Sequence, residues 1–245
     1  MDRIDFKTGT FYLGDCFDVM ATLSAGSVDM VLNDPPYGTT QNKWDAVIPF
    51  EPMWAAYWRL IKSNGAAVLT ASQPFTSALV MSQVERFKYE WVWKKSAITG
   101  VLNAKKMPVR CHEQILVFGR GGLIYNAQGL LPHGKTTKQG GNSGNYGSRK
   151  TEDYTQEFTN WPRDVLEISS EKGFHPTQKP VALFEYLIRT YTNPGELVLD
   201  NTAGSGTTVI AAIQSGRRWI CIERDPGYFE KAIARVWEAE AKLVA

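Results

Sequence analysis

The sequence has few residues of the kinds that bind metals or form disulfides. Its three cysteines, Cys16, Cys111 and Cys221, lie far apart without a CxxC spacing, which argues against a disulfide framework and against a thiolate zinc site. We therefore expect the cysteines to be buried, small apolar residues. The three histidines form no HExxH motif or mixed His/Cys cluster, so we expect no metal centre.

The chain also lacks a long apolar segment. It has no apolar run of about 18 residues, and its amino terminus, MDRIDFKTGTF, has the features of neither a signal peptide nor a transit peptide. We expect a cytoplasmic protein without membrane contact, encoded by a bacterium or a phage. With 245 residues, 43% of them hydrophobic, the chain can bury one large core, so we expect a single α/β domain over residues 1–245 with an insertion.

Basic residues are concentrated in the middle of the chain. The whole chain has 27 Lys/Arg and 25 Asp/Glu; between Trp91 and Thr151 there are ten Lys/Arg and one acid, Glu113. This segment therefore carries +9 and the remainder −7. A solvated surface would account for the charge alone. The polar, glycine-rich run HGKTTKQGGNSGNYGSRK within it is better explained by a phosphate-binding loop.

Short β-type runs alternate with amphipathic segments, which predicts a mostly parallel sheet covered by helices. We expect strands at 10–14, 28–33, 66–71, 90–94, 114–118, 197–200 and 219–223, a turn at 64–65, and helices at 16–22, 51–62, 73–86, 181–191, 207–215 and 228–243. The segment 119–173 has no clear periodicity. A loop of that length inside a compact domain is usually functional or disordered.

The run LVLDNTAGSGTTVIAA predicts a strand, an acid, a glycine turn and a helix. Asp200 ends the strand, and Gly204 and Gly206 permit a tight turn and close approach of the backbone to a ligand. Glu223 ends the next strand, at a spacing typical of the acid that accepts hydrogen bonds from ribose hydroxyls in doubly wound folds. The full GxGxxG and GxxxxGK[ST] patterns are missing. The turn therefore favours a nucleoside over NAD or a nucleoside triphosphate, and a plain strand-to-helix turn is the alternative.

The run VDMVLNDPPYG predicts a buried strand that ends in a stiff, polar loop. Pro35 and Pro36 lack N–H groups and fix the backbone, which leaves carbonyl oxygens free to accept hydrogen bonds from a ligand. Asp34 supplies a carboxylate acceptor, and Tyr37 supplies an aromatic face. These four residues suit a planar base that bears an amino group, and we expect them to be catalytic. A strand-ending turn with a capped Asp is the alternative.

In combination and in order, these motifs resemble the amino-group DNA methyltransferases of the β arrangement, in which DPPY precedes the glycine-rich cofactor turn. The resemblance spans about residues 12–229 and is carried by DPPYG, DNTAGSGTT, HPTQKP and NAKKMPVRCHEQILVFGR. It implies a circularly permuted, Rossmann-like, S-adenosylmethionine-dependent methyltransferase sheet of seven mostly parallel strands, with a target-recognition insertion at 121–174. DNTAGSG departs from the usual D-x-F-x-G-S-G pattern, because Thr202 replaces the phenylalanine.

The resemblance assigns residues to S-adenosylmethionine. Gly204 and Gly206 approach its methionine part, Glu223 holds its ribose hydroxyls, and Asp15 contacts its adenine amine, although Asp15 also suits an N-cap of the helix at 16–22. HPTQKP precedes the helix at 181–191, whose first N–H groups could receive the cofactor carboxylate; a proline-started helix explains the same motif. The expected cofactor-binding residues are Asp15, Asp34, His175, Thr177, Gln178, Lys179, Asp200, Thr202, Gly204, Gly206, Thr207 and Glu223.

The resemblance also implies double-stranded DNA as the substrate and a flipped-out base as the acceptor. Asp before Pro-Pro-Tyr accompanies adenine in this family more often than cytosine, so we expect adenine, with cytosine N4 as the alternative. A homodimer and a cognate restriction enzyme are further partners that the sequence leaves open. The residues expected to bind DNA are Lys105, Lys106, Arg110, Lys135, Lys138, Arg149 and Lys150.

Three other classes of protein share some of these features. A methyltransferase acting on RNA or on a protein amide could use a similar site, although the +9 segment disfavours a protein substrate. A nicotinamide oxidoreductase would share the glycine turn but leaves DPPYG and HPTQKP unexplained. A catalytically silent DNA-binding module would not need an apparently complete cofactor site.

Overall fold

The computed structural model describes residues 1–39, 45–137, 154–171 and 178–243. The chain divides into two compact units: Met1–Asn126 together with Asp164–Ala245, and Ala127–Arg163. Of the helices within the described ranges, none has the length and apolarity needed to span a bilayer.

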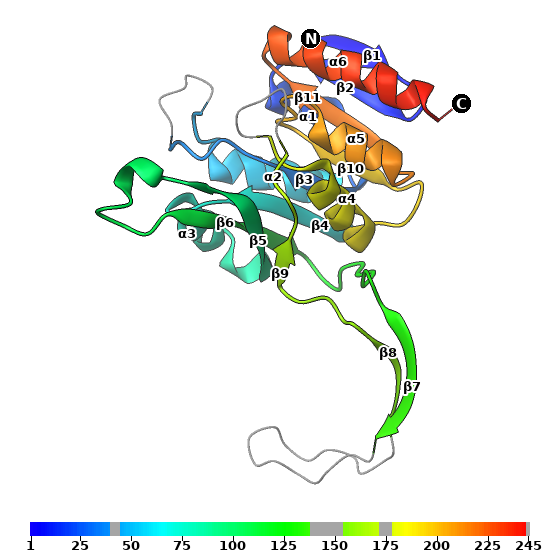
Figure 1. The fold of residues 1–245 in the computed structure, drawn as a ribbon. Coiled ribbons are helices and arrows are strands. Elements are labelled where there is room, and N and C mark those ends of the chain that lie inside the picture. The colour runs from blue at the N-terminus through cyan, green and yellow to red at the C-terminus, as the bar shows by residue number, and fades with distance from the viewer. Residues whose placement is uncertain (40–44, 138–153, 172–177, 244–245) are drawn as a thin grey trace. The chain divides into compact units, whose positions relative to one another are not determined.

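The larger unit is built on a nine-stranded mixed sheet (Figure 1). The five neighbouring strands β2, β11, β10, β3 and β4 run parallel. β1 pairs antiparallel with β2, β6 pairs antiparallel with both β4 and β5, and β9 pairs parallel with β5. Their order across the sheet is β1 (Asp2–Asp5), β2 (Gly9–Leu13), β11 (Arg218–Glu223), β10 (Leu197–Asp200), β3 (Val28–Asn33), β4 (Ile61–Ala71), β6 (Arg110–Gly119), β5 (Phe87–Thr99) and β9 (Val165–Glu167).

All seven expected strands are present, and the expected total of seven was too low. The additional strands, β1 and β9, extend the sheet at its two edges. Neither shows a hydrophobic alternation, because β1 is largely exposed and β9 contains three residues with one buried side chain, Leu166. Edge strands of this kind form through pairing with an existing sheet, which the local sequence does not reveal.

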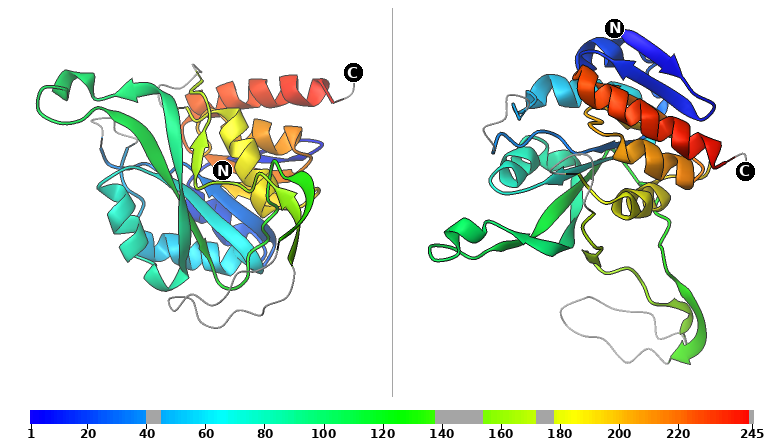
Figure 2. Two further views of the ribbon diagram at one scale, coloured as in Figure 1. Left: turned by 60° about the horizontal axis from the view of Figure 1, so that its bottom comes forward. Right: turned by 45° about the horizontal axis from the view of Figure 1, so that its top comes forward.

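Helices cover both faces of the sheet (Figure 2). The hydrophobic cluster on one face includes α4 (Val181–Tyr191), α5 (Thr207–Gln214) and α6 (Pro226–Ala241), and the cluster on the other includes α1 (Cys16–Thr22), α2 (Phe50–Leu60) and α3 (Phe75–Met81). Every residue of β3 is buried; Met30 and Leu32 join the first cluster, whereas Val31 joins the second. This two-sided burial explains why β3 is nearly continuous in apolar residues.

Three local predictions were wrong. The turn expected at 64–65 lies inside β4, where the pairing with β3 shifts register between Val28 and Met30 and the extra residues of β4 bulge. The helix expected at 73–86 is shorter, because α3 ends at Met81 and a 3₁₀ turn, Val84–Arg86, follows. Of the cysteines only Cys221 is buried, and Cys111 is exposed on the outer part of β6.

The smaller unit contains an antiparallel hairpin of β7 (Leu131–Thr137) and β8 (Tyr154–Thr159). The Asn160 side chain donates a hydrogen bond to the carbonyl of Gly129, 2.7 Å away, and so closes the open end of the hairpin. The unit lies within the range 121–174 that the sequence suggested as an insertion.

The carboxyl ends of the parallel strands meet at one edge of the sheet. β10 and β3 are adjacent there, and Asp200 ends one strand while Asp34 follows the other. Ligands of open α/β sheets bind outside this edge, where the connections leave the sheet in opposite directions. The topology therefore brings the two sequence motifs together, although more than half of the chain separates them.

Candidate active site

A cavity of about 930 Å³ lies at the carboxyl ends of the parallel strands. Ligand pockets are typically about 300–1,000 Å³, so this one has the volume of a large site. Its wall includes nearly all the expected site residues that the structure describes: Asp15, Asp34, Pro35, Pro36, Tyr37, Gln178, Lys179, Asp200, Thr202, Gly204, Thr207, Glu223 and Arg110. His175 and Thr177 lie outside the described residues.

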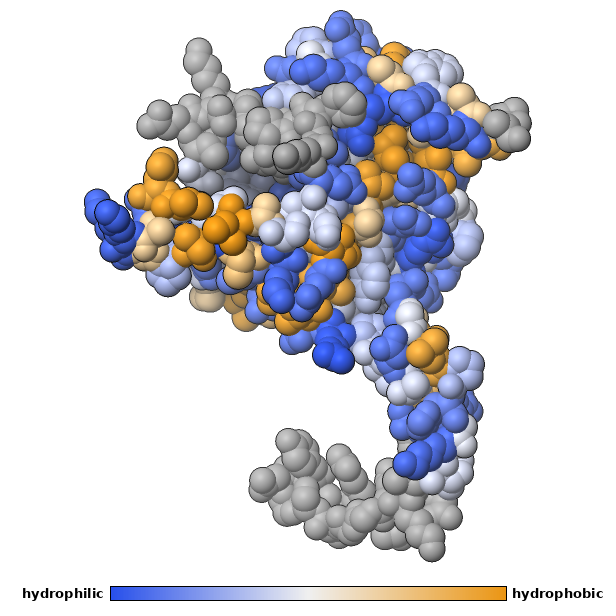
Figure 3. Space-filling model, viewed as in Figure 1, coloured by the Kyte–Doolittle hydropathy of each residue, from blue (hydrophilic) through white to orange (hydrophobic). Residues whose placement is uncertain are grey.

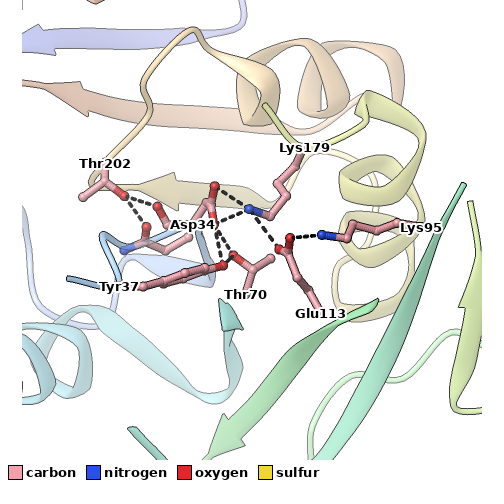
Figure 4. Close-up of polar contacts among 8 residues, drawn as sticks. Asp34, Tyr37, Thr70, Lys95, Glu113, Lys179 and Thr202 are labelled. Carbon is pink, nitrogen blue, oxygen red and sulfur yellow. Dashed lines mark hydrogen bonds and ion pairs between the residues drawn. The ribbon is translucent and has the colours of Figure 1, made fainter. Parts of the chain in front are cut away.

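Asp34 is the centre of the polar contacts in this cavity (Figure 4). Its side chain is 27% exposed, and both carboxylate oxygens contact Lys179 Nζ, at 2.7 and 2.8 Å. Oδ1 also accepts hydrogen bonds from the hydroxyls of Tyr37, at 2.9 Å, and of Thr70 on β4. The carboxylate is thus held by donors from three different parts of the fold.

Tyr37 is fixed by both its ring and its hydroxyl. The ring stacks on Phe75 of α3, with centroids 5.2 Å apart and an interplanar angle of 29°. Burial, together with the charges of Asp34 and Glu113, raises the pKa of the Tyr37 phenol well above its usual value. The phenol therefore stays protonated and acts as a hydrogen-bond donor to Asp34.

Lys179 reaches the DPPY loop, Asp34 to Tyr37, from the segment that precedes α4. Its side chain is 5% exposed, and Nζ contacts Glu113 Oε2 at 3.2 Å in addition to Asp34. Burial lowers the pKa of Lys179, but the Asp34 and Glu113 carboxylates outweigh it, so that this pKa lies above its ordinary value. Lys179, which the sequence suggested as a ligand of the cofactor carboxylate, is therefore a buried cation paired with Asp34 in this structure.

Three residues of this cluster, Thr70, Lys95 and Glu113, were missed in the sequence. Glu113 on β6 accepts a hydrogen bond from Lys95 on β5 at 2.9 Å, and both side chains are largely buried. Glu113 pairs with Trp93 across these antiparallel strands, and Lys95 lies two residues further along β5. Glu113 was visible in the sequence as the one acid of the basic segment, and an isolated acid among ten cations is a signal for a specific ion pair.

Asp200 lies at the inner end of the cavity. Its carboxylate accepts hydrogen bonds from the backbone N–H of Thr202, at 3.0 Å, and from the Thr208 hydroxyl. Burial of its side chain, which is 2% exposed, raises the pKa of Asp200 to about 7 despite these donors. A cationic ligand in the cavity would favour the ionised form of this carboxyl.

The glycine turn has the backbone conformation that its sequence predicts. Gly204 and Gly206 have φ of +52° and +81°, in the left-handed region that favours glycine. A Cβ at Gly204 would meet nothing within 4 Å, so this backbone faces open space where a ligand can approach. Gly206 is the N-cap of α5 and is not among the residues that line the cavity.

Glu223 ends β11 and closes the same turn. One carboxylate oxygen accepts from Gly204 N at 2.8 Å, and the other accepts from the N–H groups of Arg224 and Asp225. Burial is the largest influence and raises the pKa of Glu223. Asp15 is the N-cap of α1, because its carboxylate accepts from Phe17 N at 2.8 Å while it also lines the cavity.

A buried network joins the two halves of the site. The Asn33 side chain, fully buried at the end of β3, donates to Tyr57 of α2 and to Asn201 after β10, both at 2.7 Å. Thr202 donates to the Asn33 side-chain oxygen and to the Asp34 carbonyl, at 3.2 Å. Strongly paired buried polar groups of this kind hold neighbouring elements in one arrangement.

The expected DNA-binding residues fall into two groups. Lys105 and Lys106 are exposed in the connection between β5 and β6, and Arg110 begins β6 at the cavity wall. Lys135 is exposed on β7 of the smaller unit. The others, Lys138, Arg149 and Lys150, lie outside the described residues.

Comparison with known proteins identifies the family. The family model described as DNA methylase, for N6 and N4 methyltransferases, matches residues 28–234, and the chain belongs to this family. It is 32% identical to the DNA adenine methyltransferase YhdJ of Escherichia coli K12 over 254 residues, covering 96% of this chain and 84% of that protein. A putative methylase of the same organism, YubD, is 29% identical over 87% of this chain and 83% of its own length.

Solved structures agree with this assignment. The complex of M1.HpyAVI with SAM is similar with a TM-score of 0.63 and 28% identity, covering 92% of this chain and 98% of that one. The cytosine-N4-specific PvuII DNA methyltransferase has a TM-score of 0.65 over 94% of this chain and 86% of that one, and at 17% identity it shows the fold alone. The chain therefore has the α/β methyltransferase fold with a large, mostly parallel sheet.

Proposed function

We propose that this DNA amino-methyltransferase transfers the methyl group of S-adenosylmethionine to the exocyclic nitrogen of a flipped-out adenine, at a specific site in double-stranded DNA. The observation that carries the proposal is the shared cavity of about 930 Å³, which is lined by the DPPY loop on one side and by the glycine turn with Glu223 on the other. A nucleoside cofactor and a target base can thus meet in one cavity.

The residues of the cofactor half fit S-adenosylmethionine. Glu223 offers a carboxylate to the ribose hydroxyls, and the exposed backbone at Gly204 permits close approach of the methionine part. Asp200 is a buried carboxyl suited to a cationic ligand, and Asp15 and Gln178 line the same wall. Asp15 can hold the cofactor's adenine amine with the carboxylate oxygen that does not cap α1.

The chemistry of the catalytic half follows from its acceptors. The cofactor supplies a methyl group already activated on a sulfonium. An amine conjugated to a base is a poor nucleophile, so the protein has to align it and stabilise the positive charge that develops on nitrogen. Hydrogen bonds from the amine to the Asp34 carboxylate and the Pro35 carbonyl would do both, while Pro36 keeps the loop stiff.

A base inside a duplex cannot reach these acceptors, so the target base has to leave the helix. Tyr37 is the proposed stacking partner, and its packing on Phe75 gives the ring a fixed orientation before the base arrives. The acceptors and the ring belong to one four-residue loop, so a base stacked on Tyr37 presents its amine close to Asp34.

DNA contact is proposed for the connection between β5 and β6, which carries Lys105 and Lys106 beside the exposed apolar side chains of Val101, Leu102 and Met107 (Figure 3). At the base of this connection, Thr99 pairs with Arg110, and both line the cavity. Cations here would therefore hold the DNA backbone near the site of methyl transfer. We assign target recognition to the insertion at 121–174.

The chain order supports the expected circular permutation, since β3 and its catalytic loop precede β10 and the glycine turn. Adenine is favoured over cytosine because Asp precedes Pro-Pro-Tyr and because the 32% identical relative YhdJ is a DNA adenine methyltransferase. A purine also offers Tyr37 more stacking area, and stacking is worth about 1–3 kcal/mol per base.

The test is identification of the methylated product. DNA isolated after expression of the protein, and duplex DNA, single-stranded DNA and RNA methylated in vitro, are digested to nucleosides and separated by mass. We expect N6-methyladenine, with duplex DNA as the preferred substrate. N4-methylcytosine as the sole product would overturn the adenine assignment, and preferential methylation of RNA would overturn the substrate.

A further inference from the structure

Most acceptor positions of Asp34 are already occupied in this structure. Oδ1 accepts from the hydroxyls of Tyr37 and Thr70 and from Lys179, and Oδ2 accepts a second contact from Lys179. A carboxylate offers about four lone-pair sites, two on each oxygen, so Oδ1 is fully used and Oδ2 has one site left beside Lys179. A target amine that binds Asp34 therefore has to share Oδ2 with the Lys179 ammonium.

Glu113 is a second acceptor within reach of the same ammonium. Its Oε2 atom is buried and lies 3.2 Å from Lys179 Nζ, a distance that makes an ion pair, but it accepts no hydrogen bond of good geometry among the described residues. The other oxygen, Oε1, is held by Lys95 at 2.9 Å. Lys95 therefore fixes one oxygen of Glu113. The other oxygen faces Lys179 and can still accept a hydrogen bond from it.

We propose that Glu113 is a positioning residue for methyl transfer, which takes over the Lys179 ammonium when the target amine binds Asp34. This inference rests on the proposed function, because it assumes that Asp34 holds the amine. The flexible four-carbon stem of lysine lets Nζ shift between two neighbouring carboxylates without movement of the backbone. Figure 4 shows the ammonium between the two acids.

Burial makes the second acceptor necessary. Lys179 is 5% exposed, so water cannot replace a carboxylate that it loses, and an unpaired buried ammonium is strongly unfavourable. Lys95, Glu113, Lys179 and Asp34 form a chain of alternating charge. Transfer of Lys179 toward Glu113 keeps every charge in this chain paired.

Movement of the Lys179 ammonium from Asp34 to Glu113 also favours methyl transfer. The target nitrogen becomes positive as it is methylated, and an ammonium hydrogen-bonded to the same carboxylate would oppose that charge. With Lys179 on Glu113, the Asp34 carboxylate is available to stabilise the methylated amine. Glu113 thus acts through Lys179 and touches no reacting atom.

The test is a double-mutant cycle with Glu113→Gln and Lys179→Met, assayed at saturating cofactor. Gln keeps the size of Glu but cannot neutralise the ammonium, so we expect Glu113→Gln to lower kcat for DNA methylation by about tenfold or more in the wild-type background and by less than about twofold in the Lys179→Met background. Cofactor Kd of Glu113→Gln should stay close to wild type, and the loss of thermal stability caused by the unpaired Lys95 should be equal in the two backgrounds. Glu167→Gln is the matched control, because Glu167 pairs with Lys94 on the exposed surface of the same sheet, at 3.1 Å.

The outcomes are distinct. An equal loss from Glu113→Gln in both backgrounds, or a loss that follows cofactor affinity or stability, would overturn the positioning role. Lys179→Met should retain measurable methylation, since it removes the competitor for Asp34; an inactive Lys179→Met enzyme with normal cofactor binding would also overturn it. Failure of the wild-type protein to methylate any DNA would instead contradict the proposed function.

Discussion

The hydroxyl of Thr202, in the loop after β10, lies 3.2 Å from the carbonyl oxygen of Asp34, in the loop after β3, and also donates to the Asn33 side chain. One side chain of the glycine-turn motif thereby holds the DPPY loop, 168 residues away in sequence. The polar Thr202 stands at the position where the usual D-x-F-x-G-S-G pattern has phenylalanine.

Thr202→Val should destabilise the protein while leaving its shape intact. The substitution removes the donor to the fully buried Asn33 side-chain oxygen, and a buried acceptor left unsatisfied costs about 1–3 kcal/mol. We expect the free energy of unfolding in urea to fall by that amount. Thr202→Ser retains the hydroxyl and serves as the control; equal stability of the two variants would show that the hydrogen bond is unimportant.

Asp34→Asn should nearly abolish methylation and leave cofactor affinity within a few fold. The amide keeps the size of Asp34 but loses the negative charge that stabilises the methylated amine, and loss of such preorganised electrostatic stabilisation lowers kcat by about 10²–10³-fold. Single-turnover methylation and calorimetric cofactor titration measure the two effects. A parallel loss of cofactor binding would place Asp34 in the cofactor site instead of against the target amine.

Glu223→Gln should weaken S-adenosylmethionine binding by about 1.5–3 kcal/mol, the range for hydrogen bonds to a charged group. The amide oxygen can still accept from Gly204 N, but the amide NH₂ group cannot accept from the N–H groups of Arg224 and Asp225, so the turn keeps one of its three hydrogen bonds to this side chain. Calorimetric titration measures the affinity. Unchanged affinity for S-adenosylmethionine would mean that Glu223 serves only to stabilise the turn, through its hydrogen bonds with three backbone N–H groups.

Lys105 and Lys106 should contribute to DNA binding through phosphate contacts. Each lost contact lowers the slope of log affinity against log salt by about 0.9, so changing both residues to Gln should reduce it by about 1.8. Fluorescence anisotropy with labelled duplex at several salt concentrations gives the slope. Lys88→Gln with Lys242→Gln is the control, since Lys88 lies at the opposite end of β5 and Lys242 follows α6. An unaltered slope would show that the two lysines form only a solvated surface.

The sequence predicted the elements that carry strong local signals. β3 and β10 were predicted at the observed bounds because they are short, mostly apolar runs. α1 was predicted because Asp15 suits its N-cap, and α4 because amphipathic spacing follows Pro180. β1 and β9 carry no such signal, since each is stabilised by pairing at a sheet edge. Asn64 and Gly65 have the composition of a turn, but tertiary pairing with β3 places them in a bulge.

The same contrast holds for the site. Asp34, Glu223 and the glycines stand in contiguous motifs, and the resemblance that these motifs carry assigned them to one site. Glu113 and Lys95 stand in no motif. Their role depends on the pairing of β5 with β6 and on the approach of Lys179 from the start of α4, which are contacts between distant segments that local patterns do not contain.

The raised pKa of Asp200 predicts how stability depends on pH. Burial moves this pKa from an ordinary value of 3.8 to about 7, so the folded protein holds a proton there that the unfolded chain has already released. Between these two values the unfolding free energy therefore falls as pH rises, and above about 7 the loss is complete. Urea unfolding of the cofactor-free protein at pH 6 and pH 8 should show lower stability at pH 8, and the difference should be smaller in Asp200→Asn.

Affinity for the cationic cofactor should depend on pH in the opposite direction: it should rise with pH, whereas the stability of the cofactor-free protein falls. A positive ligand beside Asp200 favours the ionised carboxyl, so binding below about pH 7 has to release the proton, and affinity should fall as pH is lowered from 8 to 6. Calorimetry in buffers of different ionisation enthalpy measures this proton release directly. Asp200→Asn should bind with less pH dependence and should release fewer protons. An identical pH dependence in wild type and Asp200→Asn would mean that another group in the cavity or on the cofactor titrates, and that the Asp200 carboxyl does not sense the ligand's charge.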